Sequence, residues 1–264
     1  MNTKSVVLKR FKQLCELKYT GSTPENYTKH VSNFLDFTKN VPDRVNNEDV
    51  LDYNIHIRNY NTSTKNVIIS AIKAYFKLYL RKEIKNFSCI RPKKEIKVTK
   101  VYDAEITAIK IRAIQNTKHK AICTLGLSGW LRIGEVINLR IKDIDNERML
   151  IHIKQSKGAK DRDVTLTEET LGILRDYVRE YRPVEFLFNG QGDKPKYSRS
   201  SCNAICKDHL YSDMRFHDLR ASGATYAHEN GMSLFDISNM LGHAKIETTK
   251  HYINSRLYTV KQAI

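Results

Sequence analysis

The sequence contains no long apolar run. No stretch of its 264 residues approaches the roughly 18 apolar residues that a membrane-spanning helix requires. The first residues, MNTKSVVLKRFKQL, include basic side chains but lack the apolar segment and small-residue cleavage site of a signal peptide. These absences predict a cytoplasmic protein without a membrane partner.

Cysteine and clustered carboxylates are also scarce. Five cysteines, an odd number scattered along the chain, predict reduced thiols. Cys202 and Cys206 lie near His209 and His217, but their spacing is not a usual zinc-finger pattern and is more typical of small side chains on one buried helical face. No compact carboxylate cluster is evident, so a metal-dependent nuclease is the least favoured class of enzyme.

Acidic residues are few relative to basic ones. The chain has 45 lysines and arginines against 29 aspartates and glutamates, with a formal charge of +16. The excess is concentrated in the first 100 residues, where 20 basic residues stand against 9 acidic ones, compared with 25 against 20 in the remainder. Each phosphate contact made by a basic side chain releases condensed counterions. We therefore expect nucleic acid as the partner.

The N-terminal third has the pattern of a helical domain. Residues that favour helix starts, near Thr23, Asn46 and Asn61, precede apolar side chains at helical spacing. The third of these segments has an apolar stripe over residues 68–79, which predicts a core-facing surface, and several lysines on its other positions. We interpret residues 1–90 as one domain, with three candidate DNA contacts: Lys65, Lys73 and Lys77.

The segment RPKKEIKVTK, residues 91–100, interrupts this helical pattern. Its proline disfavours helix in the residue before it, and five of its ten residues are basic. We interpret the segment as an interdomain linker that follows phosphates, with Lys93 and Lys94 as candidate DNA contacts. The second domain then occupies residues 101–264.

The second domain combines helices with a few short strands. Helical patterns cover residues 103–115, 119–127, 167–181 and 198–210. Alternation predicts strands at 149–153 and 162–165 around a turn, and a short buried strand at 185–188. The expected fold class is therefore mainly α with a small β-sheet, an α+β arrangement.

The stretch from 216 to 252 concentrates the reactive side chains. His217 and Arg220 are three residues apart, so a helix presents both on one face, where they can reach a single small anion. Arginine suits phosphate because its planar fork donates two parallel hydrogen bonds and keeps its proton. His243 follows a Leu-Gly turn, and Tyr252, nine residues later, has a side chain able to form a covalent intermediate. These are the components of a phosphodiester-transfer site.

Three segments carry a resemblance to a known family. HDLR, LGHAKIETTKHY and SGWLRIGEVINLRIKDID resemble the signature boxes of the tyrosine recombinases, or phage integrases, and with their spacings cover most of residues 100–252. The resemblance implies a helical core-binding domain followed by a catalytic domain. It also implies a site-specific recombinase that cleaves and rejoins DNA through a 3′-phosphotyrosyl intermediate, in integration, excision or resolution, and that needs no cofactor or metal.

The resemblance implies a role for each residue of the site. Tyr252 would be the nucleophile, His217 its proton acceptor, and Lys157 the general acid toward the leaving 5′ oxygen. Lys154 and Lys160 are the alternatives to Lys157 in the same turn. Glu135 would help to organise the site, whose catalytic residues are Arg132, Lys157, His217, Arg220, His243 and Tyr252.

Two positions depart from the family pattern. Trp130 stands directly before Leu-Arg, where the family usually has glycine. Ala221 follows the second arginine of the site, where a histidine is frequent.

The resemblance also implies partners. The chain would act on double-stranded DNA as a homotetramer that joins two sites, and would be a monomer or dimer when free. The helix at 198–210, with Arg199, would lie near the major groove, and the tail after Tyr252 would pack on its own subunit or on a neighbour. Two other functions fit the same residues: a type IB topoisomerase-like enzyme that nicks and reseals one duplex, and a catalytically inert DNA-binding protein.

Overall fold

The structure is a computed structural model that describes residues 3–84, 90–92, 99–154, 161–190, 192, 194–243 and 246–250. The chain divides into two compact units, Met1–Ile96 and Lys97–Ile264, each with its own hydrophobic core. The expected class, mainly helical with a small sheet, is confirmed.

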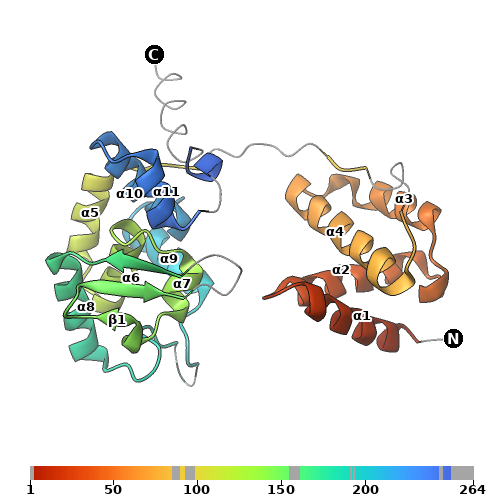
Figure 1. Ribbon diagram of the computed structural model, residues 1–264, viewed down its shortest axis with the longest axis horizontal. Coiled ribbons are helices and arrows are strands. Elements are labelled where there is room, and N and C mark those ends of the chain that lie inside the picture. The colour runs from red at the N-terminus through yellow and green to blue at the C-terminus, as the bar shows by residue number, and fades with distance from the viewer. Residues whose placement is uncertain are drawn as a thin grey trace, which may run out of the picture. The chain divides into compact units, whose positions relative to one another are not determined.

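The N-terminal unit is a helical bundle in which α2 packs against both α1 and α4 (Figure 1). The side chains of Asn46 and Asn61 cap α3 and α4 as expected, by accepting hydrogen bonds from backbone N–H groups. Helix α2 begins one residue earlier than expected, because Ser22 is its N-cap residue and Thr23 is already helical. The elements are α1 (Lys4–Lys18), α2 (Thr23–Thr38), η1 (Pro42–Arg44), α3 (Asn47–His56), η2 (Ile57–Asn59), α4 (Thr62–Tyr75) and the π-helical turn η3 (Phe76–Leu80).

The apolar stripe of α4 forms the core of this unit, as predicted. Ile68, Ile72 and Tyr75 are buried together with Phe11 of α1 and Phe34 of α2. The rings of Phe11 and Tyr75 meet edge to face with centroids 5.3 Å apart. This packing fixes the backbone of α4 and η3, which carries their basic side chains.

The C-terminal unit is built around α6, which contacts α5, α7, α8, α9 and α10 (Figure 1). The thiols of Cys202 and Cys206 are buried on α9 with Cys123 of α6, in keeping with small side chains on one helical face. The helices are α5 (Ala104–Ala113), α6 (Thr117–Leu127), α7 (Ile133–Asn138), η5 (Ile141–Asp143), α8 (Glu168–Tyr181), α9 (Arg199–His209), α10 (Phe216–Glu229) and α11 (Leu234–Leu241).

A three-stranded antiparallel sheet has the order β1 (Ile144–Asp145), β2 (Leu150–Ile153) and β3 (Arg162–Thr165). The hairpin of β2 and β3 was predicted, and it pairs Ile153 with Arg162. Strand β1 was not predicted, because two residues are too few to show alternation. The strand expected at 185–188 is wrong: its only ladder contact in the described structure is an isolated bridge from Phe186 to Arg140, although residues 186–188 are buried as expected.

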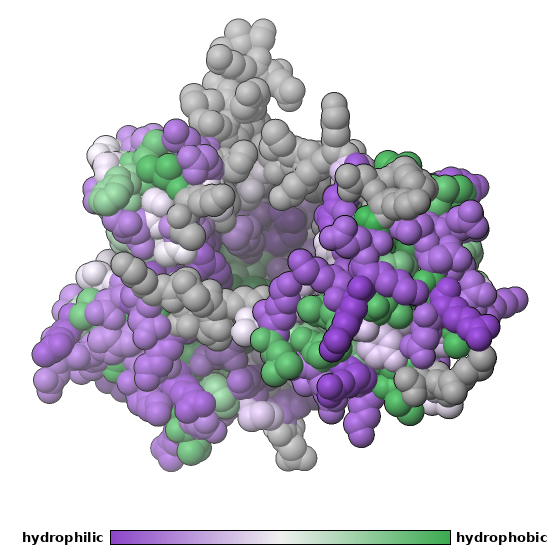
Figure 2. All heavy atoms as spheres, turned by 45° about the vertical axis from the view of Figure 1, so that its right-hand side comes forward, coloured by the Kyte–Doolittle hydropathy of each residue, from purple (hydrophilic) through white to green (hydrophobic). Residues whose placement is uncertain are grey.

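Hydrophilic side chains cover most of the described surface on the face drawn in Figure 2, and apolar residues form small separate patches. Within the described residues, no helix is both long and apolar enough to cross a membrane.

Candidate active site

Arg132 and Glu135 form a reciprocal pair at the start of α7. Arg132 is the N-cap residue, and its backbone N–H donates to Glu135 Oε2 at 2.8 Å. The Arg132 guanidinium donates from Nη1 to Glu135 Oε1 at 2.9 Å. A carboxylate at this position satisfies a backbone N–H that the start of a helix leaves without an intrahelical partner. The three-residue spacing therefore fixes the Arg132 guanidinium at the start of the helix.

Arg220 is fully buried in the second turn of α10. Its Nη1 donates to the Trp130 carbonyl oxygen at 2.5 Å, and its Nη2 donates to the Leu241 carbonyl oxygen at 2.6 Å. The same Nη2 lies 3.3 Å from His243 Nε2. A buried guanidinium requires such fixed acceptors because it cannot lose its charge. Arg220 thus links the segments that precede α7 and follow α11.

Trp130 turns the chain so that its carbonyl reaches Arg220. Its φ angle is +49°, in the left-handed region that favours glycine, which explains why glycine suits this position. The indole is buried against Ala221 and Leu241. Gly223 permits this approach, because a Cβ atom there would lie 2.6 Å from Trp130 Nε1. Packing of the indole therefore offsets the unfavourable backbone conformation.

A third arginine, Arg162 at the start of β3, was not predicted from the sequence. Its Nη1 and Nη2 donate to Glu135 Oε1 and Oε2 at 2.9 and 2.8 Å, and only 8% of its side chain is exposed. The Arg220 Nη1 atom lies 3.8 Å from the same Oε2. A signal was available: Arg162 shares a strand face with buried Val164, and an inward-facing arginine needs a carboxylate partner.

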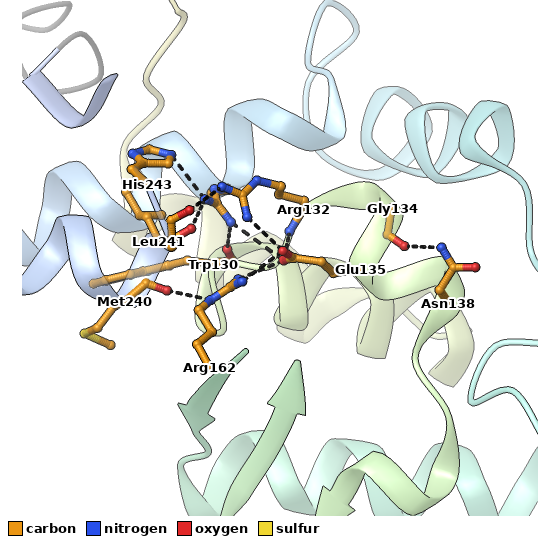
Figure 3. Close-up of polar contacts among 11 residues, drawn as sticks. Trp130, Arg132, Gly134, Glu135, Asn138, Arg162, Met240, Leu241 and His243 are labelled. Carbon is orange, nitrogen blue, oxygen red and sulfur yellow. Dashed lines mark hydrogen bonds and ion pairs between the residues drawn. The ribbon is translucent and has the colours of Figure 1, made fainter. Parts of the chain in front are cut away.

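All three arginines donate hydrogen bonds to the end of α11, and Figure 3 labels two of them, Arg132 and Arg162. Three successive carbonyl oxygens, of Met240, Leu241 and Gly242, accept from Arg162 Nε, Arg220 Nη2 and Arg132 Nη2 at 2.9, 2.6 and 3.0 Å. The last carbonyls of a helix lack intrahelical partners and carry its negative partial charge. Gly242 adopts a φ of +60°, which ends the helix and leads into His243. The arginines therefore fix the position of His243.

Burial and the arginines set the protonation of the site. Burial by itself would raise the pKa of Glu135, but the ion pairs with Arg162 and Arg132 outweigh it and lower this pKa to about 2. Burial and the charges of Arg220 and Arg132 lower the pKa of His243 to about 3. The pKa of His217 is also lowered, by burial first and by Arg220 second. At neutral pH Glu135 is therefore a carboxylate, and the imidazoles of His217 and His243 are neutral.

An open cavity of about 930 Å³ lies beside this cluster. Arg132, Glu135 and His217 line it together with Arg199 of α9 and Lys154 at the end of β2. The Arg199 guanidinium packs on Gly134, where a Cβ atom would lie 2.9 Å from Nη2. The cavity is therefore lined by Arg132, a predicted phosphate ligand, by His217, the predicted proton acceptor, and by Arg199, a predicted DNA contact.

The other predicted residues are placed as follows. Lys157, Tyr252, Lys93 and Lys94 lie outside the described residues, as does Lys160. Thr249, three residues before Tyr252, has its hydroxyl 2.9 Å from His243 Nδ1. In the N-terminal unit, the Lys65 ammonium donates to the Arg58 carbonyl oxygen, whereas Lys73 and Lys77 line a hollow of about 500 Å³ with Arg81 and Lys82.

Glu135→Gln is expected to destabilise the protein by about 3 to 5 kcal/mol, because it leaves buried arginine charge uncompensated. Since the pKa of Glu135 is depressed, its contribution to stability is present above the ordinary carboxyl pKa and is lost as pH falls toward 2. The measurement is urea unfolding at neutral and acidic pH.

Glu169→Gln is the matched control for that substitution. Glu169 forms an exposed pair with Arg112 at 2.6 Å, and an exposed pair contributes about 0 to 1 kcal/mol. An equal loss of unfolding free energy in both variants would contradict the role assigned to Glu135.

Comparison with known proteins matches both units. Residues 99–257 match the phage integrase family, and residues 7–86 match the phage integrase N-terminal SAM-like domain. The putative integrase/recombinase y4qK of Sinorhizobium fredii is 32% identical over 244 residues, which cover 89% of this chain and 79% of the relative. Tyrosine recombinase XerA of Pyrococcus furiosus is 26% identical over 271 residues, which cover 99% and 93% of the two chains.

Solved structures agree with these matches. A crystal structure of XerA recombinase superimposes with a TM-score of 0.53 and 25% identity, covering 99% of each chain. A lambda integrase dimer bound to a core site has a TM-score of 0.73 and 15% identity, covering 97% of this chain and 96% of that one, and shows the same fold. The resemblance of the signature boxes is confirmed: this chain belongs to the phage integrase family and is a tyrosine recombinase.

Proposed function

We propose that this tyrosine recombinase exchanges DNA strands by attack of Tyr252 on one phosphodiester held at the cluster of Arg132, Arg220 and His243. The observation that carries the proposal is the charge of the cluster. Three guanidinium groups converge on a single carboxylate, so the site has excess positive charge beside an open cavity. The transition state of phosphoryl transfer gains negative charge on its non-bridging oxygens, which preorganised cations stabilise.

Each chemical step has a residue assigned to it. The Tyr252 oxygen forms a bond to phosphorus as the bond to the 5′ oxygen breaks, which gives a 3′-phosphotyrosyl link and a 5′ hydroxyl. His217 accepts the phenol proton, for which its lowered pKa keeps it neutral at pH 7. Lys157 protonates the leaving oxygen. A 5′ hydroxyl of a partner strand then reverses the step.

His243 changes role when phosphate arrives. Its Nε2 atom lies 3.3 Å from Arg220 Nη2, and its pKa is depressed by burial and by the arginines. A phosphate offsets the charge of the arginines and so raises the pKa of His243, which favours a protonated imidazole that donates to a non-bridging oxygen. The arginines and the histidine are thus matched to a substrate anion.

The reaction retains its bond energy, because one phosphodiester replaces another at each step. Strand exchange therefore requires neither ATP nor a metal ion in this scheme. We assign residues 91–100 to a basic linker between the two domains. We also propose that Arg199 contacts DNA near the major groove.

The test is a nicked suicide substrate in the presence of EDTA, on which cleavage releases a short fragment and cannot be reversed. We expect a covalent protein–DNA species that survives detergent and disappears with protease. Binding without this species would identify an inert DNA-binding protein. Relaxation of supercoils without exchange between two duplexes would identify a topoisomerase-like enzyme. Strand exchange in a complex of four protomers and two duplexes is the outcome that agrees with a homotetramer.

The hollow lined by Lys73 and Lys77 supplies a second prediction for the DNA interface. A double Lys73→Gln, Lys77→Gln variant is expected to weaken binding and to reduce the slope of log affinity against log salt by about 1.8, since each phosphate contact contributes about 0.9. The measurement is a salt titration of DNA binding. Lys9→Gln, Lys29→Gln removes the same charge from exposed positions of α1 and α2, and an equal change in slope would show that the effect is general charge.

A further inference from the structure

Arg162 joins three parts of the site that are distant in the sequence. It begins β3, its two Nη atoms bind both oxygens of Glu135, and its Nε donates to the Met240 carbonyl at the end of α11. A guanidinium alone among side chains can make these three bonds at once, because its donors form a planar fork with a further N–H at the side. Lysine can supply the charge but not this geometry.

Arg162 and Arg132 bind the same two parts of the protein, Glu135 and the end of α11. Glu135 is shared by Arg162 and Arg132, and the end of α11 is also shared by them, through Met240 and Gly242. Each arginine therefore limits the movement of the other through two common partners. His243 directly follows Gly242, so its position depends on the same contacts.

The sheet register adds a further connection. Arg162 pairs with Ile153 of β2, and Lys154, the next residue, lines the cavity. This pair flanks residues 154–161, the part of the chain that carries Lys157. Arg162 thus fixes the base of the hairpin to Glu135 and to α11.

We propose that Arg162 is a positioning residue for DNA cleavage, which orients Arg132 and His243 toward the scissile phosphate by binding Glu135 and the end of α11 simultaneously. This inference rests on the proposed function. Arg162 itself need not touch the substrate, since its side chain is 8% exposed and its donors face protein acceptors.

If Arg162 only stabilised the fold, its removal would not change how the cleavage rate depends on pH. If Arg162 positions Arg132 through Glu135, its removal should change that dependence. The charged groups that face Glu135 are Arg132 before α7, Arg162 on β3 and Arg220 on α10, while Arg199 of α9 and His217 lie in the same cavity. Against the effect of burial, Arg162 is the strongest influence that lowers the pKa of Glu135. Without Arg162 this pKa rises, so Glu135 gains a proton as the pH falls and releases the Arg132 guanidinium.

The experiment is single-turnover cleavage of the suicide substrate at saturating protein, over the range of about pH 5.5 to 9. Arg162→Met is expected to reduce the rate about tenfold to a hundredfold at alkaline pH, as small displacements of catalytic groups do. It should also lose more rate at acidic pH than the wild type, in which protonation of His217 alone slows cleavage. Adding Glu135→Gln should remove this additional acidic loss, because an amide does not titrate.

Two further variants separate geometry from charge and from folding. Arg162→Lys is expected to fold, to bind DNA as the wild type does and to cleave more slowly, without the additional acidic loss, because it keeps the charge but not the fork. Arg112→Met removes an arginine from the exposed bidentate pair with Glu169 and should cleave at the wild-type rate. Thermal unfolding and DNA affinity are measured for each variant.

The positioning role would be overturned if Arg162→Lys cleaves at the wild-type rate. It would also be overturned if a folded Arg162→Met has the same pH profile of cleavage as the wild type. If Arg162→Met does not fold, the rate of Arg162→Lys decides. A wild-type protein that forms no covalent species contradicts the proposed function instead, so the two failures are distinguishable.

Discussion

Tyr252→Phe is expected to form no covalent species on a nicked suicide substrate, while it binds the same DNA with wild-type affinity. Phenylalanine keeps the aromatic ring but lacks the oxygen that we propose attacks phosphorus, so the loss should be complete rather than partial. The measurement combines denaturing electrophoresis of the protein–DNA mixture with a binding isotherm under the same conditions.

The matched control is Tyr226→Phe. Tyr226 is 39% exposed on α10, and its hydroxyl donates to Glu105 at 3.0 Å, away from the arginine cluster. This variant should form the covalent species at the wild-type rate. Equal amounts of adduct from Tyr252→Phe and the wild type would mean that another residue is the nucleophile.

Under the proposed mechanism, Arg220→Ala is expected to reduce cleavage about a hundredfold to a thousandfold, the effect of removing one preorganised donor to a developing negative charge. The guanidinium is fully buried, so solvent does not replace the missing charge. The change also leaves the carbonyl oxygens of Trp130 and Leu241 without their arginine donor. Single-turnover rates at saturating protein give the effect on the chemical step.

Arg220→Lys separates charge from geometry at this position. An ammonium keeps the positive charge but cannot span the two carbonyls and His243 together, so we expect a rate between those of the wild type and Arg220→Ala. Arg179→Ala changes an exposed arginine of α8 whose partner is Asp176, and it should leave the rate unchanged. A folded Arg220→Ala variant that cleaves within tenfold of the wild type would contradict the assigned role.

Much of the fold was predictable because it depends on local patterns. Asn46 and Asn61 each cap the helix that follows them, and such caps are short-range features. The β2–β3 hairpin was predictable from alternation around a polar turn. The expected strand at 185–188 failed because its backbone partner, residues 139–141, shares only two hydrogen bonds with it around the Phe186–Arg140 bridge and does not extend the pairing.

The site was predictable where a motif or resemblance names its residues. The pairing of Arg132 with Glu135 follows from a three-residue spacing, and the structure brings both to Arg220 and His243. Arg162 was not predicted, because its partner lies 27 residues away and on a different element. The backbone acceptors at the end of α11 were not predicted either. Every residue type has a carbonyl oxygen, so the sequence does not indicate which carbonyls accept from an arginine.

The most direct measurement of the central claim is cleavage of DNA in which a neutral methylphosphonate replaces the scissile phosphate. Arg220 is assigned to offset a charge that this substrate lacks. We expect Arg220→Ala to cleave the methylphosphonate within about tenfold of the wild-type rate on that substrate, although it is slowed about a hundredfold to a thousandfold on the phosphodiester. Tyr252→Phe should remain inactive on both. If Arg220→Ala, folded and bound to DNA, is slowed as much on the methylphosphonate as on the phosphodiester, then the arginine cluster does not act by neutralising the scissile phosphate.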